Sequence, residues 1–291
     1  ISSIGSRFLN GNTGVTYLYL PKSFSRAGVN ERFGSTYSML CGSAVETVEF
    51  EDGIETIPDN SLKDATATTS VILPASVKTI GNNAFRNSSL TSLTLPAGVE
   101  TLGYGMIYGN TGIKELTIPS TVTTMDYYAY SNGGGTFENS ALETVTVEEG
   151  VTVIGSHAFA NCPALNEITL PEGLLKLNSY AFWQCTALEQ IDIPSTITSI
   201  GEYAFGNTGL MELTLPVELQ SIDAQFLYGN TGVKYLLIPK SFTYAGYTQY
   251  GNSMLQGSAV EMVEFEEGIE IIPNYSLYNA TTVTEVSIPS S

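Results

Sequence analysis

The chain has few basic residues and is strongly acidic. It contains 11 lysines and arginines against 29 aspartates and glutamates, which gives a formal net charge of −18 at pH 7. The sequence shows no basic patch, so nucleic acid and anionic membrane are poor candidate partners. No apolar run approaches the ~18–20 residues of a membrane-spanning helix, and we expect no membrane insertion in this segment.

Residue types and motifs that commonly carry catalysis are also scarce. His157 is the only histidine, so histidines cannot form a metal cluster, and it occupies a variable position that predicts a surface or edge residue. No serine stands in a nucleophile elbow, and neither G-x-x-x-x-G-K-[ST] nor G-x-G-x-x-G occurs. The sequence therefore predicts a protein that is not an enzyme and that binds no cofactor.

The chain contains only three cysteines, too few for a disulfide framework. Cys162 and Cys185 are one repeat length apart, and two alternatives remain open. The position is either a small, partly buried one that accepts a thiol, or the site of a disulfide between adjacent turns whose Cα atoms would lie about 5 Å apart. The sequence pattern assigns these residues of other turns to the same position: Ser88, Thr111, Ser140, Thr208 and Thr231.

What the sequence does contain is a repeat. Successive copies begin a short apolar strand at steps of 30, 23, 22, 23, 29, 23, 23, 22, 23, 27 and 23 residues. Most steps are 22 or 23, and each lap runs in the same direction, so the strands are predicted to be parallel. A solenoid has no single closed core, and repetition overrides length as a guide to domain number. The strand starts are Val15, Val45, Thr68, Leu90, Ile113, Leu142, Leu165, Leu188, Leu210, Val233, Val260 and Val283.

Three kinds of residue punctuate the repeat. Proline follows many of the strands, and because it lacks an N–H group it ends them at a fixed point. An Ala-Phe pair such as Ala204-Phe205 recurs and is predicted to form an internal stack. An asparagine then turns the chain, and its amide is expected to bond the adjacent lap. We expect one structural position for the six turn asparagines Asn87, Asn110, Asn139, Asn161, Asn207 and Asn230.

A longer period also exists, because a three-turn module occurs three times. Each copy contains one long repeat, followed by an acidic turn in place of the proline, such as Glu51-Asp52-Gly53 or Glu266-Glu267-Gly268. The first and last copies are close: residues 11–24 read GNTGVTYLYLPKSF and residues 229–242 read GNTGVKYLLIPKSF. This similarity indicates duplication of a block.

The pattern L-x-x-I-x-[IL]-P-x-x-[VI]-x-x-I-G-x-x-A-F-x-[NQ]-C, clearest at residues 165–185 and 188–207, resembles the BspA-like leucine-rich repeats of bacterial surface proteins. The resemblance implies a right-handed, β-rich solenoid with a parallel concave sheet and short helical or irregular convex turns. It also implies a secreted or cell-surface protein. We expect one domain over residues 1–291, with about eleven full repeats of 22–30 residues, cut through repeats at both ends.

Exposed aromatic residues are the main candidates for binding, because they make good contact anchors on a rigid scaffold. Those on outward strand positions either contact a ligand or fill space beside the long loops: Tyr17, Tyr19, Tyr235, Leu237 and Met262. Those in the long loops either form a recognition surface or a flap packed on the solenoid: Tyr127, Tyr128, Tyr130, Tyr244, Tyr247 and Tyr250.

Two acidic groups allow three interpretations. They form a solvated acidic face, a weak calcium site of hard oxygen ligands, or the paired carboxylates of a glycoside hydrolase. The calcium candidates are Glu49, Glu51, Asp52, Glu264, Glu266 and Glu267.

The resemblance favours a non-enzymatic binding scaffold that contacts host or microbial macromolecules, with a protein or glycan ligand. Two alternatives stay open. One is a structural spacer that presents other domains, and the other is a glycan-binding module that stacks sugars on the tyrosine-rich loops.

Overall fold

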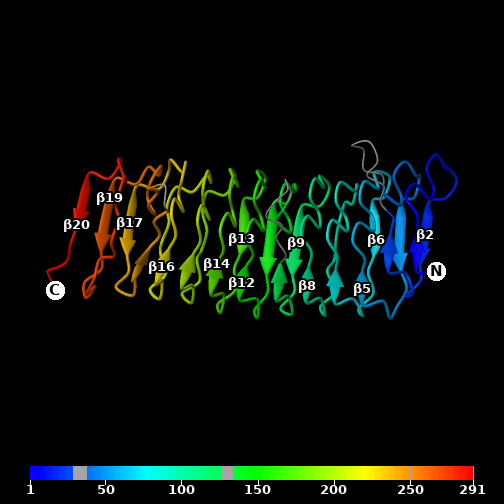
Figure 1. The fold of residues 1–291 in the computed structure, drawn as a ribbon, viewed down its shortest axis with the longest axis horizontal. Coiled ribbons are helices and arrows are strands. Elements are labelled where there is room, and N and C mark those ends of the chain that lie inside the picture. Colours follow the sequence, from blue (N-terminus) through cyan, green and yellow to red (C-terminus); the bar gives the residue numbers. More distant parts are fainter. Residues whose placement is uncertain (29–37, 126–133, 249–250, 291) are drawn as a thin grey trace. The chain divides into compact units, whose positions relative to one another are not determined.

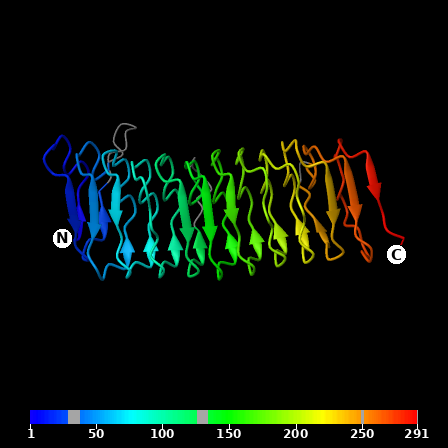
Figure 2. The ribbon, with the colours of Figure 1, turned by 180° about the vertical axis from the view of Figure 1, so that it is seen from behind.

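The computed structural model describes residues 1–28, 38–125, 134–248 and 251–290. The described chain is a parallel-strand β-solenoid that divides into two compact units, Ile1–Val145 (unit 1) and Thr146–Ser291 (unit 2). Many laps contain a strand of three or four residues and a strand of two residues, and Figures 1 and 2 show these two kinds of arrow pointing in opposite directions. The prediction of parallel strands is confirmed, whereas handedness and a single domain stay predictions.

In the described part of unit 1 the strands form three parallel sheets, with strand orders β1-β3, β2-β4-β6 and β10-β8-β7-β5. Their bounds are β1 Ser3–Ile4, β2 Tyr17–Leu20, β3 Arg26–Ala27, β4 Thr47–Phe50, β5 Thr56–Ile57, β6 Ser70–Ile72, β7 Thr79–Ile80, β8 Thr101–Leu102 and β10 Thr124–Met125. Strand β9 covers Glu115–Ile118, and β11 covers Thr144–Val147, where unit 1 ends and unit 2 begins in the sequence.

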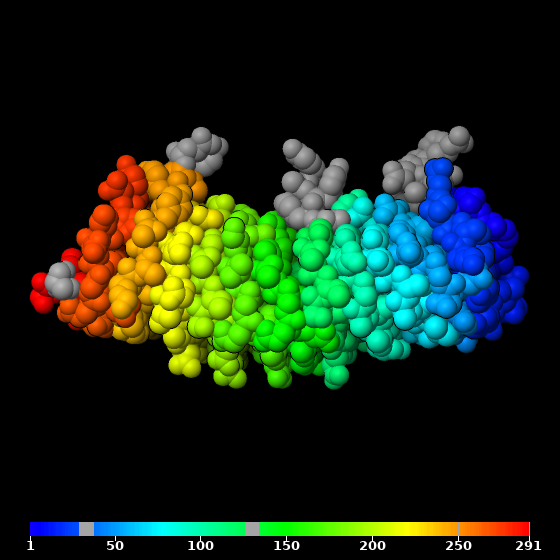
Figure 3. All heavy atoms as spheres, turned by 90° about the horizontal axis from the view of Figure 1, so that it is seen from below, coloured from blue at the N-terminus to red at the C-terminus, as the bar shows by residue number. Residues whose placement is uncertain are grey.

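Among the residues of unit 2 that the structure describes, the strands form two parallel sheets, with strand orders β12-β14-β15-β16-β18 and β17-β19-β20. Their bounds are β12 Val153–Ile154, β14 Lys176–Leu177, β15 Ser199–Ile200, β16 Ser221–Ile222, β17 Tyr235–Ile238, β18 Tyr244–Ala245, β19 Met262–Phe265 and β20 Glu285–Ser287. Strand β13 covers Glu167–Thr169. The laps of this unit appear as successive colour bands on its surface (Figure 3).

The turn after the strand contains the same backbone hydrogen bond whether its first residue is proline or an acidic residue. Val77 N donates to Pro74 O over 3.2 Å, and Ile54 N donates to Glu51 O over 3.2 Å. Glycine at position 53 has φ 90°, a conformation that costs a residue with a side chain about 1–2 kcal/mol. The acidic turns therefore keep the turn of the regular repeat.

Short helices, one of the two predicted forms of the convex turns, do not occur in the described part of the chain. The turns there are irregular, and each of several contains two left-handed residues four positions apart. Tyr203 and Asn207 have φ 54° and 53°, and Asn83 and Asn87 have φ 52° and 51°. A right-handed helix cannot continue through such residues, so this convex part of each lap is a series of turns.

The prediction of one position for all six turn asparagines is wrong. Asn207 is left-handed, but in the variant turn Gly229 (φ 69°) takes that place, and Asn230 lies one position further on, where the preceding lap has Thr208. There the Asn230 amide donates to Thr208 O and Leu210 O. Asn110 repeats the arrangement. Gly109 takes the left-handed position, and the amide of Asn110, the next residue, is buried and donates to Ser88 O and Leu90 O. Asn110 and Asn230, not Thr111 and Thr231, are thus the equivalents of the cysteine position.

The core of unit 2 is a stack of phenylalanines. Phe159, Phe182 and Phe205 are fully buried, and neighbouring ring centroids are 5.6 Å apart with planes within 4°. The predicted internal stack is confirmed here. Cys162 and Cys185 lie buried beside it as thiols rather than a disulfide, and burial raises the pKa of Cys185 well above its usual value.

Candidate functional site

An exposed tyrosine pair lies on the outer face of β2 in unit 1. The side chains of Tyr17 and Tyr19 are 51% and 49% exposed, as the strand alternation predicts. The Tyr17 hydroxyl donates to Glu49 Oε2 on β4, which holds the ring in place. This hydrogen bond, then burial and the charge of Glu49, raise the pKa of Tyr17 above its usual 10.0.

Unit 2 carries the same arrangement on β17 and β19. Tyr235 and Leu237 are 44% and 42% exposed, and the Tyr235 hydroxyl donates to Glu264 Oε2 over 2.8 Å. Met262 is half-buried and stands opposite Tyr235 in the parallel register. The structure therefore brings three of the predicted binding residues, from β17 and β19, together on one face of their sheet.

The acidic turns beside these faces cap backbone groups. Glu51 Oε2 accepts a hydrogen bond from Lys22 N over 2.7 Å, and Glu266 Oε2 accepts one from Lys240 N over 2.8 Å. Among the described residues, no group of three or more His, Cys, Asp or Glu side chains is arranged to hold a metal ion. Calcium binding by the predicted carboxylates stays a prediction, and the observed role of Glu51 and Glu266 is to fix the chain after the preceding strand.

A second tyrosine surface, here called the tyrosine groove, lies in unit 2 beside β18. Its open recess of about 490 Å³ is lined by Tyr244, Tyr247, Ile271, Tyr275, Thr243, Ala245, Ile272, Pro273 and Asn274. The Tyr247 and Tyr275 rings stack with centroids 4.1 Å apart, and Tyr278 meets both edge-on. Ile271 is 73% exposed.

The sequence identified Tyr244 and Tyr247 but missed the other wall of the groove, which includes Ile271 and Tyr275. Tyr275 could have been found from the repeat, because it takes the same repeat position as Tyr203. In the structure both residues are left-handed, with φ 64° at Tyr275. The predicted loop tyrosines Tyr127, Tyr128, Tyr130 and Tyr250 lie outside the described residues.

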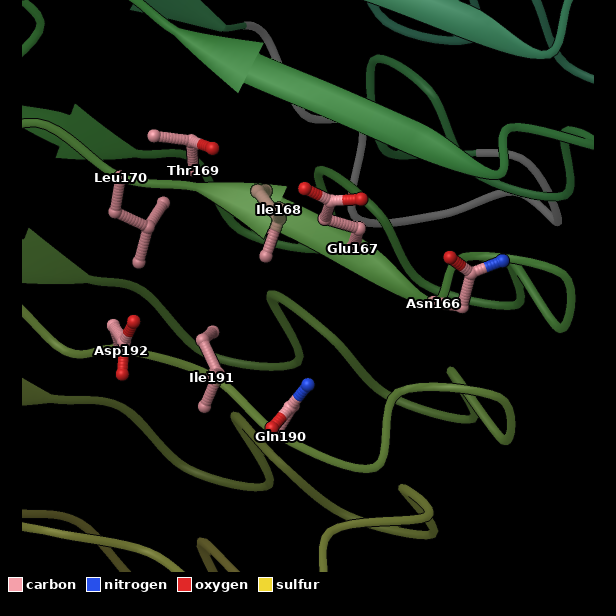
Figure 4. A pocket seen from close by; sticks show the side chains of 8 residues that line it. All are labelled: Asn166, Glu167, Ile168, Thr169, Leu170, Gln190, Ile191 and Asp192. Atoms are coloured by element: carbon pink, nitrogen blue, oxygen red, sulfur yellow. The ribbon is translucent and has the colours of Figure 1, made fainter.

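The pairing of parallel strands is interrupted at each recess. Residues 188–194 follow β13 without forming a strand, and a recess of about 500 Å³ opens between the two laps (Figure 4). Glu167 and Thr169 project from β13, and Gln190 and Asp192 project from the next lap (Figure 4). Residues 90–96 follow β6 in the same way, with a recess of about 350 Å³. Residues 271–272, which take the place of β18 in the next lap, likewise form no strand.

His157 begins a ladder of aromatic rings along the turns of unit 2. Its ring stacks on Tyr180 at 4.5 Å, and Tyr180 stacks on Tyr203 at 4.9 Å. Trp183 meets Tyr203 edge-on, and the Trp183 ring lies where a Cβ at position 206 would be 2.4 Å away, so only glycine fits there. These ring faces cover one another, which indicates a structural ladder and places His157 within it.

Burial of the imidazole lowers the pKa of His157 from 6.5 to about 4. The folded protein therefore keeps the ring neutral, whereas the unfolded chain takes up a proton below about pH 6.5. We predict that this group's contribution to stability is fully present above pH 6.5 and declines as the pH falls towards 4.

The measurement is urea unfolding of the wild-type chain and of His157→Asn across this pH range. Asparagine suits the left-handed backbone (φ 56°) and is native at position 83. Because other carboxylates titrate in both proteins, only the difference between the two stabilities reports on His157. A difference that stays constant between pH 7 and pH 4 would contradict the prediction.

Parallel strands, laps of 22 or 23 residues and an inward stack of apolar side chains define a leucine-rich-repeat solenoid. The chain belongs to the BspA-type leucine-rich-repeat family, whose model matches residues 36–134, 133–256 and 245–291 in six copies. The family and fold are those of repeat scaffolds, which are not known as enzymes. No curated protein matches the chain.

Solved structures show the same fold at low sequence identity. A leucine-rich-repeat protein from Bacteroides ovatus is 20% identical, with a TM-score of 0.66 over 99% of this chain and 75% of that one. One from Eubacterium ventriosum is 18% identical, with a TM-score of 0.51 over 99% and 78%. A leucine-rich cell surface protein from Faecalibacterium prausnitzii is 20% identical, with a TM-score of 0.49 over 100% and 84%. In the described part of this chain, no helix has the length and apolar character to cross a membrane.

Proposed function

We propose that this protein is a non-enzymatic adhesion scaffold, secreted or displayed on a bacterial surface, that binds a protein partner through the tyrosine groove. The observation that carries the proposal is the convergence of Tyr244, Tyr247 and Tyr275 on one recess. Apolar and aromatic side chains that converge on a recess are typical of the anchors that dominate protein interfaces. The family resemblance supports the surface location.

The groove favours binding over a purely structural spacer. A spacer needs only the buried stack and the ladders, and the tyrosines Tyr244 and Tyr247 beside β18 belong to neither. The stacked pair Tyr247 and Tyr275 is ordered before a partner arrives, which reduces the entropy lost on binding. Beside the tyrosines, Thr243 and Asn274 supply polar groups, and this mixture also favours a glycan as the second candidate ligand.

The test compares the wild-type chain with the double variant Tyr244→Ser and Ile271→Ser. Binding is measured on a panel of purified extracellular matrix proteins and on a glycan array. We expect a protein ligand whose affinity falls at least about tenfold in the double variant, because two anchor side chains are lost.

The matched control is Met211→Ser with Val217→Ser, which also removes two exposed apolar side chains of unit 2 but lies outside the groove. This control should bind as the wild type does. Equal losses in both variants would contradict the groove assignment. Binding to glycans alone would favour the second candidate, and binding to neither class would favour the spacer.

A further inference from the structure

The two strand faces around Tyr17 and Tyr235 are duplicates in structure as well as in sequence. In each, a tyrosine hydroxyl donates to a glutamate on the neighbouring strand, Glu49 or Glu264. A Cβ at Gly53 would lie 3.6 Å from Lys22 Cδ, and one at Gly268 would lie 3.7 Å from Lys240 Cδ. These matching contacts show that the two strand faces share the tyrosine–glutamate hydrogen bond and the glycine turn beside a lysine.

Both faces combine exposed side chains with concentrated negative charge. In unit 1 burial, and then the negative charges of Glu51, Glu49 and Asp52, raise the pKa of the Tyr19 hydroxyl. The corresponding acidic residues of unit 2 are Glu264, Glu266 and Glu267, and Glu264 stands opposite Leu237 in the parallel register. A face of this kind attracts a cation and disfavours an anion.

A guanidinium group suits a tyrosine ring bordered by carboxylates. It can lie over the ring and donate to the acid at the same time, which an ammonium group does less well. The protein already contains this type of contact, because the Arg86 guanidinium lies 4.0 Å above the Tyr108 ring. An extended partner segment would also match Tyr17 and Tyr19. In an extended chain every second side chain points to the same face, which is the spacing of these two tyrosines on β2.

We propose that the chain carries two equivalent sites for an arginine-containing, extended segment of a protein partner, one on the strand face of each unit. The first consists of Tyr17, Tyr19 and Glu49, and the second of Tyr235, Leu237 and Glu264. They are separate from the tyrosine groove. The remaining copy of the three-turn module does not add a third site, because β9 has Glu115 and Thr117 where β2 has the two tyrosines.

The experiment is isothermal titration of the whole chain with a short peptide that alternates arginine and threonine, at low salt. We expect two sites per chain and an affinity that decreases with added salt. Tyr17→Ser with Tyr19→Ser should reduce the count to one, and Tyr235→Ser with Leu237→Ser should remove the other site. Each double variant should weaken its own site at least about tenfold, so that only the other site is seen at the concentrations at which the wild type fills both.

These variants leave the net charge unchanged, so they separate a built site from diffuse attraction. Unchanged binding in both double variants, or a count other than two in the wild type, would overturn the proposal. Tyr17→Phe keeps the ring but loses the hydrogen bond to Glu49, and it should bind more tightly than the double variant. The groove variant Tyr244→Ser with Ile271→Ser should still bind two peptides, so failure of one proposal is distinguishable from failure of the other.

Discussion

Replacing Phe182 with alanine is expected to lower the free energy of unfolding by about 3–5 kcal/mol. The ring is fully buried, and it stacks on Phe159 on one side and Phe205 on the other. Removing it exposes both neighbours to a cavity and ends two aromatic contacts of about 0.5–1.5 kcal/mol each. Laps on either side cannot close the gap, because the ladder β12-β14-β15-β16-β18 holds them at a fixed spacing.

Denaturant unfolding followed by circular dichroism measures the effect. Phe182→Leu should lose less stability, because it keeps most of the volume. Phe8→Ala is the control, since Phe8 is 53% exposed and its loss should change stability by less than about 0.5 kcal/mol. A loss below about 1 kcal/mol for Phe182→Ala would show that the stack contributes little.

The scaffold could be predicted from the sequence because each of its parts depends on local spacing. Inward residues such as Leu20 and Ile118 follow the two-residue period of a strand, and both are buried. Pro21 and Pro119 stop these strands because they cannot extend a ladder. The exposure of Tyr17 and Tyr19 follows from the same alternation.

The tyrosine groove could be predicted only in half because its walls are far apart in the sequence. Tyr247 and Tyr275 come from different laps, and the long repeat between them breaks the regular step. An alignment by period therefore does not show that these rings meet. The recess at Glu167 and Asp192 escaped prediction for a related reason. Residues 188–194 have a regular repeat sequence, and nothing local indicates that they form no strand.

The position of Asn230 also required the structure, and it leads to the second large predicted effect. This side chain is 2% exposed, and its amide donates to Leu210 O over 2.9 Å and to Thr208 O over 3.2 Å. Its Oδ1 accepts a hydrogen bond from Val233 N over 2.9 Å. Asn230→Ala leaves these backbone groups buried without partners, and we expect a loss of about 3–5 kcal/mol in the free energy of unfolding.

The matched control is Asn207→Gly, one lap earlier in the same unit. Asn207 serves the chain through its left-handed backbone, and the next lap has glycine at the equivalent position 229. Glycine adopts that conformation without strain, so this variant should change stability by less than about 1 kcal/mol. Denaturant unfolding of both variants decides the matter. Similar losses for the two would mean that the asparagines do share one role, whereas a large loss confined to Asn230→Ala requires the buried amide to join two laps.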